Sequence, residues 1–266
     1  MRNKVLSGKY KLQIRLAGRS HAMNCEKLNH PYIELDASSI DPLTVFDLAV
    51  SAESLFTASG VYSSVSEVSV IPKYRHSLSL GDMALVGRMV SPIQTLVERN
   101  HEKITRTLGL KAFSIGRLEA SCVVFGNGSF FQRHRDTISA VPERRRYTWV
   151  YYFHRQPRLF TGGALRFFNR QSITAEVEPE NGRLIVFRAD TPHEVTQVEL
   201  VSEEFAAGRF TLTGFVYDSA GPFRRLKFSV DRQIDRLPFS RSKQQVLRKY
   251  LRSLARRIEQ RWHLRG

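Results

Sequence analysis

The chain has 266 residues, enough to bury a substantial core, and one catalytic domain with terminal additions is the expected organisation. Hydrophobic residues make up 42% and aromatic residues 11% of the chain, which excludes a disordered protein. The formal net charge is +16, but about fourteen Lys and Arg residues lie between Arg224 and Arg265 against three acids, so the charge belongs mainly to the C-terminal tail.

The cysteines and the N-terminus indicate the compartment. Cys25 and Cys122 are far apart and form neither a disulfide framework nor a zinc-binding motif, which favours a reducing environment. Residues 1–18 mix basic and apolar side chains without the unbroken apolar core of a signal peptide. No stretch has the length of a membrane-spanning helix. We therefore expect a soluble, cytoplasmic protein with no membrane contact.

The N-terminal part of the chain predicts a strand followed by helices. Basic and apolar residues alternate in Lys11–Leu16, which indicates an edge strand or hairpin. Apolar residues at helical spacing follow the Asp41-Pro42 start signal from Leu43 to Ala58 and predict one helix. The same spacing recurs from Asp82 through Leu108, where Pro92 interrupts the pattern. This segment predicts one longer helix or a pair of helices.

From Phe113 the pattern changes to short β-rich segments separated by turn residues. The predicted strands are Arg117–Phe125, Phe130–Asp136, Tyr147–His154, Ala164–Phe168, Leu184–Phe187 and Phe210–Tyr217. Gly126-Asn127-Gly128, between the first two, is a strong signal for a hairpin turn. Several short strands at this spacing favour a β-sandwich or barrel over a βαβ sheet. The expected fold class is mainly β with flanking helices.

The tail predicts a terminal amphipathic helix. Ser242 and Gln245 have the spacing of a capping box. One apolar stripe follows, made of Val246, Tyr250, Leu251, Leu254, Ile258 and Trp262. The rest of the helix surface is largely Arg and Lys. The helix could dock on the back of the barrel and leave its basic face in solvent, or it could contact a nucleic acid or another polyanion through counterion release.

Three residues predict a metal site. Residues two apart in a strand share one face, so His134 and Asp136 would point the same way. With His193 from a neighbouring strand they supply two His and one carboxylate, the set used by non-haem Fe(II) oxygenases. Arg209 opens the following strand and is a natural partner for a remote cosubstrate carboxylate. The alternative is that both histidines are ordinary polar residues near strand ends.

Five segments in a fixed order resemble one enzyme family. They are Gly126-Asn127-Gly128 ahead of Arg133-His134-Arg135-Asp136, then Tyr151-Tyr152, then Gly162 to Phe167, then Pro192-His193-Glu194-Val195, and then Arg209 to Thr213. From about Leu118 to Asp218 the chain resembles the prolyl 4-hydroxylase-like (Egl-nine-type) branch of Fe(II)- and 2-oxoglutarate-dependent dioxygenases. The resemblance implies a double-stranded β-helix, a jelly-roll or cupin-like core with the metal at its open end.

The resemblance also implies roles for individual residues. The two histidines and the aspartate named above would hold Fe(II) and carry catalysis. Arg209 would pair with the distal carboxylate of 2-oxoglutarate, Tyr152 would give that carboxylate a hydroxyl donor, and Thr213 would be a further contact. Tyr152 could instead be a core aromatic residue beside Tyr151. Glu199 to Gly208 reads as a loop inserted ahead of Arg209.

The implied reaction is hydroxylation of an amino-acid residue, of prolyl type, in a protein or peptide, with release of succinate and CO₂. 2-Oxoglutarate and O₂ would be cosubstrates, and L-ascorbic acid is a candidate reductant. Retention of Asp136 favours hydroxylation over halogenation, because related halogenases give up this carboxylate to make room for halide. Arg144, Arg145 and Arg146 would capture an acidic substrate, unless they form a solvated surface cluster.

Other functions are alternatives. The substrate could be a free amino acid or small metabolite. A nucleic-acid demethylase is disfavoured, because that branch usually carries two Arg in the strand after the distal His, and only Arg209 is present here. A basic polyanion-binding module with an inactive barrel is an alternative of another class. The expected regions are 1–112, which supports the barrel and shapes the entrance, 113–220, the dioxygenase core, and 221–266, the basic extension; the sequence does not indicate an oligomeric state.

Overall fold

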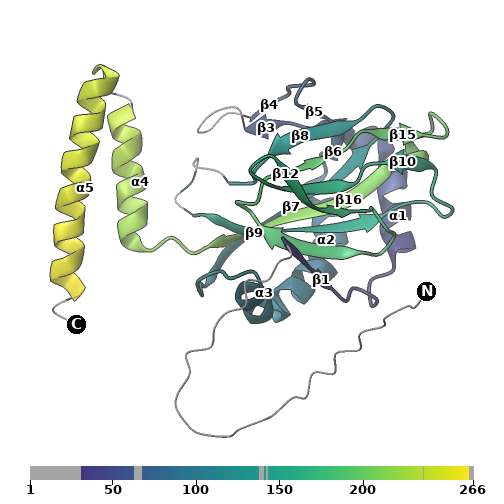
Figure 1. The fold of residues 1–266 in the computed structure, drawn as a ribbon, viewed down its shortest axis with the longest axis horizontal. Coiled ribbons are helices and arrows are strands. Elements are labelled where there is room, and N and C mark those ends of the chain that lie inside the picture. The colour runs from purple at the N-terminus through teal and green to yellow at the C-terminus, as the bar shows by residue number, and fades with distance from the viewer. Residues whose placement is uncertain (1–30, 63–67, 138–140, 142, 236, 264–266) are drawn as a thin grey trace, which may run out of the picture.

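The computed structural model describes residues 31–62, 68–137, 141, 143–235 and 237–263, and its centre is a pair of antiparallel sheets (Figure 1). The larger sheet has the strand order β1 (Tyr32–Leu35), β13 (Leu184–Arg188), β9 (Arg145–Phe153), β16 (Arg209–Asp218), β7 (Ile115–Phe125), β6 (Leu78–Leu80), β2 (Phe56–Ala58). The smaller has the order β12 (Ser172–Val177), β11 (Leu165–Asn169), β14 (His193–Val195), β8 (Phe130–His134), β5 (Arg75–His76). The predicted β-rich fold is thereby confirmed.

Two further pairs of short strands complete the β structure. They are β10 (Phe160–Gly162) with β15 (Val198–Leu200), and β3 (Val61–Tyr62) with β4 (Val68–Ser69). The segment expected to be an inserted loop ahead of Arg209 thus begins inside a strand, and it also contains a short 3-10 helix, η2 (Phe205–Ala207).

Side chains along the central strands alternate between the two faces of the larger sheet and so contribute to two separate hydrophobic cores. On β9, Val150 and Tyr152 face the smaller sheet and pack with Phe167 and Phe187 between the two sheets. The intervening residues Trp149 and Tyr151 belong to the other core, on the opposite face of the larger sheet. Because both faces of β9 are covered, its side chains are almost all buried, and the strand reads as a nearly continuous run of large residues.

Helices cover that opposite face of the larger sheet. They are α1 (Pro42–Ser51), α2 (Met83–Arg99) and α3 (His101–Thr107). The Asp41 side chain accepts hydrogen bonds from the backbone N–H groups of Leu43 and Thr44, each 3.1 Å long, so the predicted start is confirmed. The predicted end at Ala58 is wrong, because the chain leaves the helix after Ser51 and forms η1 (Glu53–Leu55) and β2.

The second helical segment is a pair, one of the two arrangements predicted. Pro92 lies inside α2 without ending it, and Asn100 separates α2 from α3. Asp82 caps α2 by accepting hydrogen bonds from the backbone N–H groups of Ala84 and Leu85. Buried residues of α2, among them Ile93 and Val97, pack into the core on this face of the larger sheet.

The turn at Gly126-Asn127-Gly128 does not make a hairpin, and this prediction is wrong. β7 pairs with β16 and β6, whereas β8 pairs with β14 and β5. The turn passes the chain from the larger sheet to the smaller one. It is held by β15, since Gly128 N donates to Val198 O at 2.8 Å and Leu200 N donates to Asn127 Oδ1 at 3.2 Å. These tertiary contacts, and not the local turn signal, decide which strands pair.

The tail forms two helices, α4 (Pro222–Asp235) and α5 (Arg241–His263), of which only the second was predicted. Gln244 N donates to Ser240 O, so Ser240 stands at the N-cap position and the predicted capping box at Ser242 is wrong. Figure 1 shows α5 beside α4 and apart from the barrel, so the first of the two arrangements considered, a helix docked on the barrel, is not the one observed. None of the described helices is long and apolar enough to cross a membrane.

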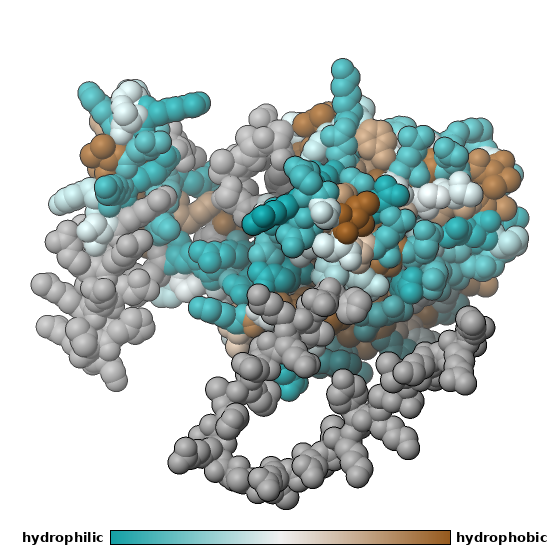
Figure 2. All heavy atoms as spheres, in the orientation of Figure 1, coloured by the Kyte–Doolittle hydropathy of each residue, from teal (hydrophilic) through white to brown (hydrophobic). Residues whose placement is uncertain are grey.

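The described surface of the helical pair is mostly hydrophilic, with scattered hydrophobic side chains (Figure 2). Val246 and Tyr250, which the sequence places on the apolar stripe, are 70% and 61% exposed. The alternating segment Lys11–Leu16 lies outside the described residues, so its predicted strand stays a prediction.

Candidate metal and cosubstrate site

The structure brings together the three residues predicted to bind a metal. His134 ends β8, Asp136 follows it, and His193 opens β14, directly opposite His134 in the strand register. The Nε2 atoms of His134 and His193 lie 3.5 Å from Oδ1 and Oδ2 of Asp136, respectively. One candidate ligand atom from each residue lies within 4.8 Å of the others. This cluster could hold a single metal ion.

Backbone carbonyls orient both imidazoles. Nδ1 of His134 lies 2.8 Å from Gln132 O, and Nδ1 of His193 lies 2.9 Å from Thr191 O. A carbonyl only accepts, so each Nδ1 carries a proton and donates it; in the neutral imidazole Nε2 then has a free lone pair. Burial, together with the neighbouring His134, lowers the pKa of His193 to about 4, although Asp136 opposes the shift. His193 is therefore neutral near pH 7, the form that binds metals.

The carboxylate of Asp136 is held in place by its neighbours. Thr148 on β9 donates a hydrogen bond of 2.7 Å to Oδ2, and the backbone N–H of Asp136 donates to Ala189 O at 2.9 Å. Burial alone would raise the pKa of Asp136, but the interactions with His193, His134 and Thr148 outweigh burial and hold it well below its usual value. Asp136 is therefore ionised, as a metal ligand must be.

A pocket between the sheets contains the metal-site cluster and one face of β16. Arg209, Thr211 and Thr213 alternate along that strand and line the pocket. Arg209 is 2% exposed, and its Nε donates to Gly163 O at 2.7 Å. Thr213 thus lies on the same face as Arg209, as the period of two predicts, and Thr211 between them is a lining residue that we did not predict.

Tyr152 lies against Arg209. Its ring centroid is 5.1 Å from the guanidinium carbon, and Phe125 lies at 4.8 Å from the same carbon. The buried Tyr152 hydroxyl has no hydrogen-bond acceptor among the described residues. Burial raises the pKa of Tyr152 to about 12 against the opposing charge of Arg209, so the hydroxyl keeps its proton and remains a donor.

Arg209 and Tyr152 together are suited to bind an anionic ligand. Within the described part of the chain, no carboxylate lies at ion-pair distance from Arg209. A buried guanidinium without a counterion, beside a hydroxyl without an acceptor, leaves donor capacity that a carboxylate would satisfy. The donor chemistry therefore agrees with a site for a dicarboxylate whose far end reaches Arg209.

Arg75 is a pocket residue that sequence reasoning missed. It lies on β5, the edge strand next to β8, and lines the same pocket as the metal-site cluster. Its Nε donates to Ser77 Oγ at 2.9 Å, its Nη1 donates to Gly60 O at 3.2 Å, and its guanidinium lies over the Phe131 ring at 4.8 Å. Nothing near Arg75 in the sequence marks it as part of a site built about sixty residues later.

The three consecutive arginines line a different cleft, together with Arg188 and Asp190. Arg145 is buried and donates to Tyr217 Oη and to Asp136 O, which supports the backbone of the metal site. Arg146 lies 3.5 Å from Asp218, and only Arg144 is exposed among the three. At least Arg145 and Arg146 thus have structural contacts, and none of the three lines the pocket of the metal site.

Comparisons with known proteins agree with this geometry. Residues 120–217 match the model of the 2OG-Fe(II) oxygenase superfamily. An uncharacterized PKHD-type hydroxylase of Synechocystis sp. is 30% identical over 145 residues, which cover 50% of this chain and 48% of the relative, so the chain spans about half of that relative's length.

Among solved structures, a prolyl hydroxylase from Trichoplax adhaerens, in complex with a peptide fragment of hypoxia inducible factor, is 18% identical with a TM-score of 0.52. The match covers 71% of this chain and 84% of that one. A prolyl-4-hydroxylase from Pseudomonas putida is 24% identical with a TM-score of 0.48, over 70% and 92% of the two chains. Residues 120–217 of this chain therefore resemble the 2OG-Fe(II) oxygenase superfamily, and the fold is like that of the Trichoplax prolyl hydroxylase.

Proposed function

We propose that this chain is an Fe(II)- and 2-oxoglutarate-dependent dioxygenase in which His134, Asp136 and His193 hold the iron. The observation that carries the proposal is the convergence of two imidazole nitrogens and one ionised carboxylate in a pocket that also contains the buried cation Arg209. The superfamily implies Fe(II), 2-oxoglutarate and O₂ as cofactor and cosubstrates. Such a ligand set leaves coordination positions open for a substrate.

The iron with 2-oxoglutarate and O₂ would supply the oxidising power for C–H hydroxylation, with release of succinate and CO₂. The protein residues position the reactants. Carbonyls at Gln132 and Thr191 fix the two imidazoles, and Thr148 fixes the carboxylate. Arg209 binds the distal carboxylate of 2-oxoglutarate, and Thr213 is a further contact on the same wall of the pocket. Tyr152 lies against Arg209 without itself lining the pocket, and its hydroxyl would donate to the same carboxylate.

The proposed substrate is a prolyl-type residue in a protein or peptide. Two observations support it: the five segments that resemble the prolyl 4-hydroxylase-like branch, and the PKHD-type hydroxylase among the relatives. A free amino acid or small metabolite is the alternative, and the same metal and cosubstrate residues would serve it.

An anaerobic optical titration tests the cofactor chemistry. Fe(II) and then 2-oxoglutarate are added to the purified protein, and we expect the visible metal-to-ligand charge-transfer band of a ketoacid chelated to ferrous iron. His134→Ala should lose both iron binding and the band. His76→Ala, an exposed histidine on the adjacent strand β5, is the matched control and should keep both. Folded wild-type protein without a band would contradict the proposal and favour a barrel that binds other molecules without catalysis.

Incubation with O₂ and a proline-containing peptide tests the reaction. Succinate formation that depends on the peptide, together with a mass gain of one oxygen atom in the peptide, is the expected result. If only free amino acids gain oxygen, the proposed dioxygenase activity stands, but the substrate is a free amino acid and not a peptide.

A further inference from the structure

The pocket of the candidate metal site contains two arginines in very different settings. Arg209 lies on β16 of the larger sheet and has a proposed partner, the distal carboxylate of the cosubstrate. Arg75 lies on β5 at the edge of the smaller sheet, next to the strand that ends in His134. Both side chains line the same pocket, so both charges act on whatever it binds.

Among the described residues, the hydrogen-bond and ring partners of Arg75 are all neutral. Its guanidinium donates to the Ser77 hydroxyl and the Gly60 carbonyl and lies over the Phe131 ring. Burial lowers the pKa of Arg75 to about 10, and the negative charge that opposes this shift is the carboxylate of Asp136. Arg75 therefore stays protonated near pH 7 but has no carboxylate within ion-pair distance in the described part of the chain.

The loaded site would leave the charge of Arg75 unbalanced. A ferrous ion carries two positive charges and Asp136 one negative charge, so the metal centre is singly positive. 2-Oxoglutarate brings two negative charges, and Arg209 offsets the one at its distal end. The sum over these groups is zero, and Asp136, the carboxylate that stabilised Arg75, is then bound to the metal. Arg75 is partly buried, and an uncompensated cation in such a setting is costly unless a counterion joins it.

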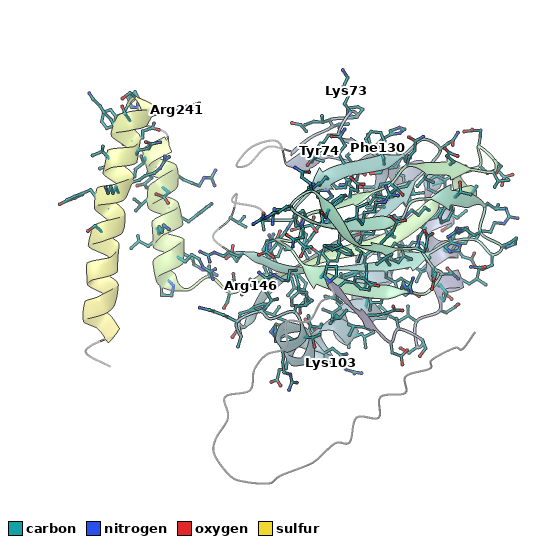
Figure 3. All side chains as sticks on the ribbon, viewed as in Figure 1. Lys73, Tyr74, Lys103, Phe130, Arg146 and Arg241 are labelled. Atoms are coloured by element: carbon teal, nitrogen blue, oxygen red, sulfur yellow. The ribbon has the colours of Figure 1, made fainter. Side chains whose placement is uncertain are left out.

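We propose that Arg75 binds a carboxylate of the primary substrate and thereby holds the substrate beside the metal. This inference rests on the proposed function and adds the substrate class, an amino-acid or peptide substrate that carries a negative charge near the carbon to be hydroxylated. The position of Arg75 suits this role, because its side chain lines the same pocket as the candidate metal ligands. Figure 3 shows its neighbour Tyr74, together with Phe130, at the edge of the barrel where β5 meets β8.

Matched pairs of small probes test the proposal, with isothermal titration calorimetry on anaerobic protein loaded with Fe(II) and 2-oxoglutarate. One pair is N-acetyl-L-proline and N-acetyl-L-prolinamide, which differ in a terminal carboxylate. The other is N-acetyl-aspartyl-proline amide and N-acetyl-asparaginyl-proline amide, which differ in a side-chain carboxylate. We expect the charged member of at least one pair to bind about tenfold more tightly, and Arg75→Gln to abolish that difference. Arg75→Lys, which keeps the charge, should retain part of it.

Arg166→Gln is the control. Arg166 lies on β11 between the buried residues Leu165 and Phe167, is paired with Glu176, and does not line the pocket. If the charged member binds more tightly in the first pair, the carboxylate that Arg75 binds belongs to a free amino acid or a chain terminus. If it does so in the second pair, that carboxylate belongs to an acidic side chain. Equal affinities within both pairs, or no measurable binding of either pair, would overturn the inference. So would an Arg75→Gln variant that weakens 2-oxoglutarate binding and leaves the preference intact.

The charge-transfer band distinguishes failure of the inference about Arg75 from failure of the proposed function. If the band forms in the wild type and in Arg75→Gln while the probes show no preference, the inference about Arg75 fails and the proposed function stands. If the wild type gives no band, the proposed function itself fails.

Discussion

Thr148 donates a hydrogen bond of 2.7 Å to Oδ2 of Asp136, and this contact links the larger sheet to the candidate metal site. Thr148→Val keeps the shape of the side chain and removes the donor. We expect the affinity for Fe(II) to fall by about 10–100-fold, the usual effect of losing a group that orients a metal ligand. An anaerobic Fe(II) titration measures the change. Thr148→Ser, which retains the hydroxyl, should stay close to the wild type, and equal affinities in all three proteins would contradict the role.

Arg209→Gln tests the cosubstrate end of the pocket. Removing one partner of a buried charge pair costs about 2–5 kcal/mol, so the concentration of 2-oxoglutarate needed for half-maximal band formation should rise by at least about 30-fold. Fe(II) affinity in the absence of 2-oxoglutarate should not change, because Arg209 is not a candidate metal ligand. Arg158→Gln, an arginine paired with Glu178 outside the metal-site pocket, is the control. Unchanged cosubstrate affinity in Arg209→Gln would point to another anchor.

Gly163→Ala should disturb the same anchor through packing. Gly163 has φ +71°, and a Cβ there would lie 2.5 Å from Cδ of Arg209 and 2.9 Å from Cγ2 of Val198. Gly128→Ala is a close match, because Gly128 has φ +67° and a Cβ there would meet nothing within 4 Å. The control should lose about 1–2 kcal/mol of unfolding free energy from backbone strain alone. Gly163→Ala should lose more and should also need more 2-oxoglutarate, as urea unfolding and the optical titration would show.

Cys122 should be unreactive in the folded protein. It is fully buried on β7, and burial raises the pKa of its thiol. A raised pKa means that less of the reactive thiolate is present at a given pH, so iodoacetamide at a pH of about 8.5, the ordinary thiol value, should not label it. In a Cys25→Ser variant Cys122 is the remaining thiol, and labelling should begin only when guanidinium chloride unfolds the protein. Rapid labelling of the native variant would contradict the burial.

The site was predictable to the extent that it depends on local pattern. His134 and Asp136 are two residues apart at a strand end, and Arg209 and Thr213 are four apart on one strand, so the period of two places each pair on one face. Thr148 and Arg75 were not predictable in this way. Each reaches the site because its strand pairs with a partner far away in sequence, Thr148 with Phe215 and Arg75 with Phe131.

The errors in the fold have the same origin. Gly126-Asn127-Gly128 has the composition of a hairpin turn, and composition does not reveal whether the next strand joins the same sheet. Helical spacing continued past Ser51 in the sequence, but Phe56 joins the edge of the larger sheet instead. In the tail, Pro222 after Gly221 is a start signal for α4 that the prediction of a single terminal helix left out.

The two ends of the proposed cosubstrate site belong to different sheets, since His134 and His193 lie on the smaller sheet and Arg209 on the larger one. A dicarboxylate bound to the metal at one end and to Arg209 at the other would therefore act as a cross-link that opposes separation of the sheets. Because a ligand that binds only the folded state raises the free energy of unfolding by RT ln(1 + [L]/Kd), the iron and 2-oxoglutarate should together raise the melting temperature cooperatively. Either one alone would hold only one side of the sandwich.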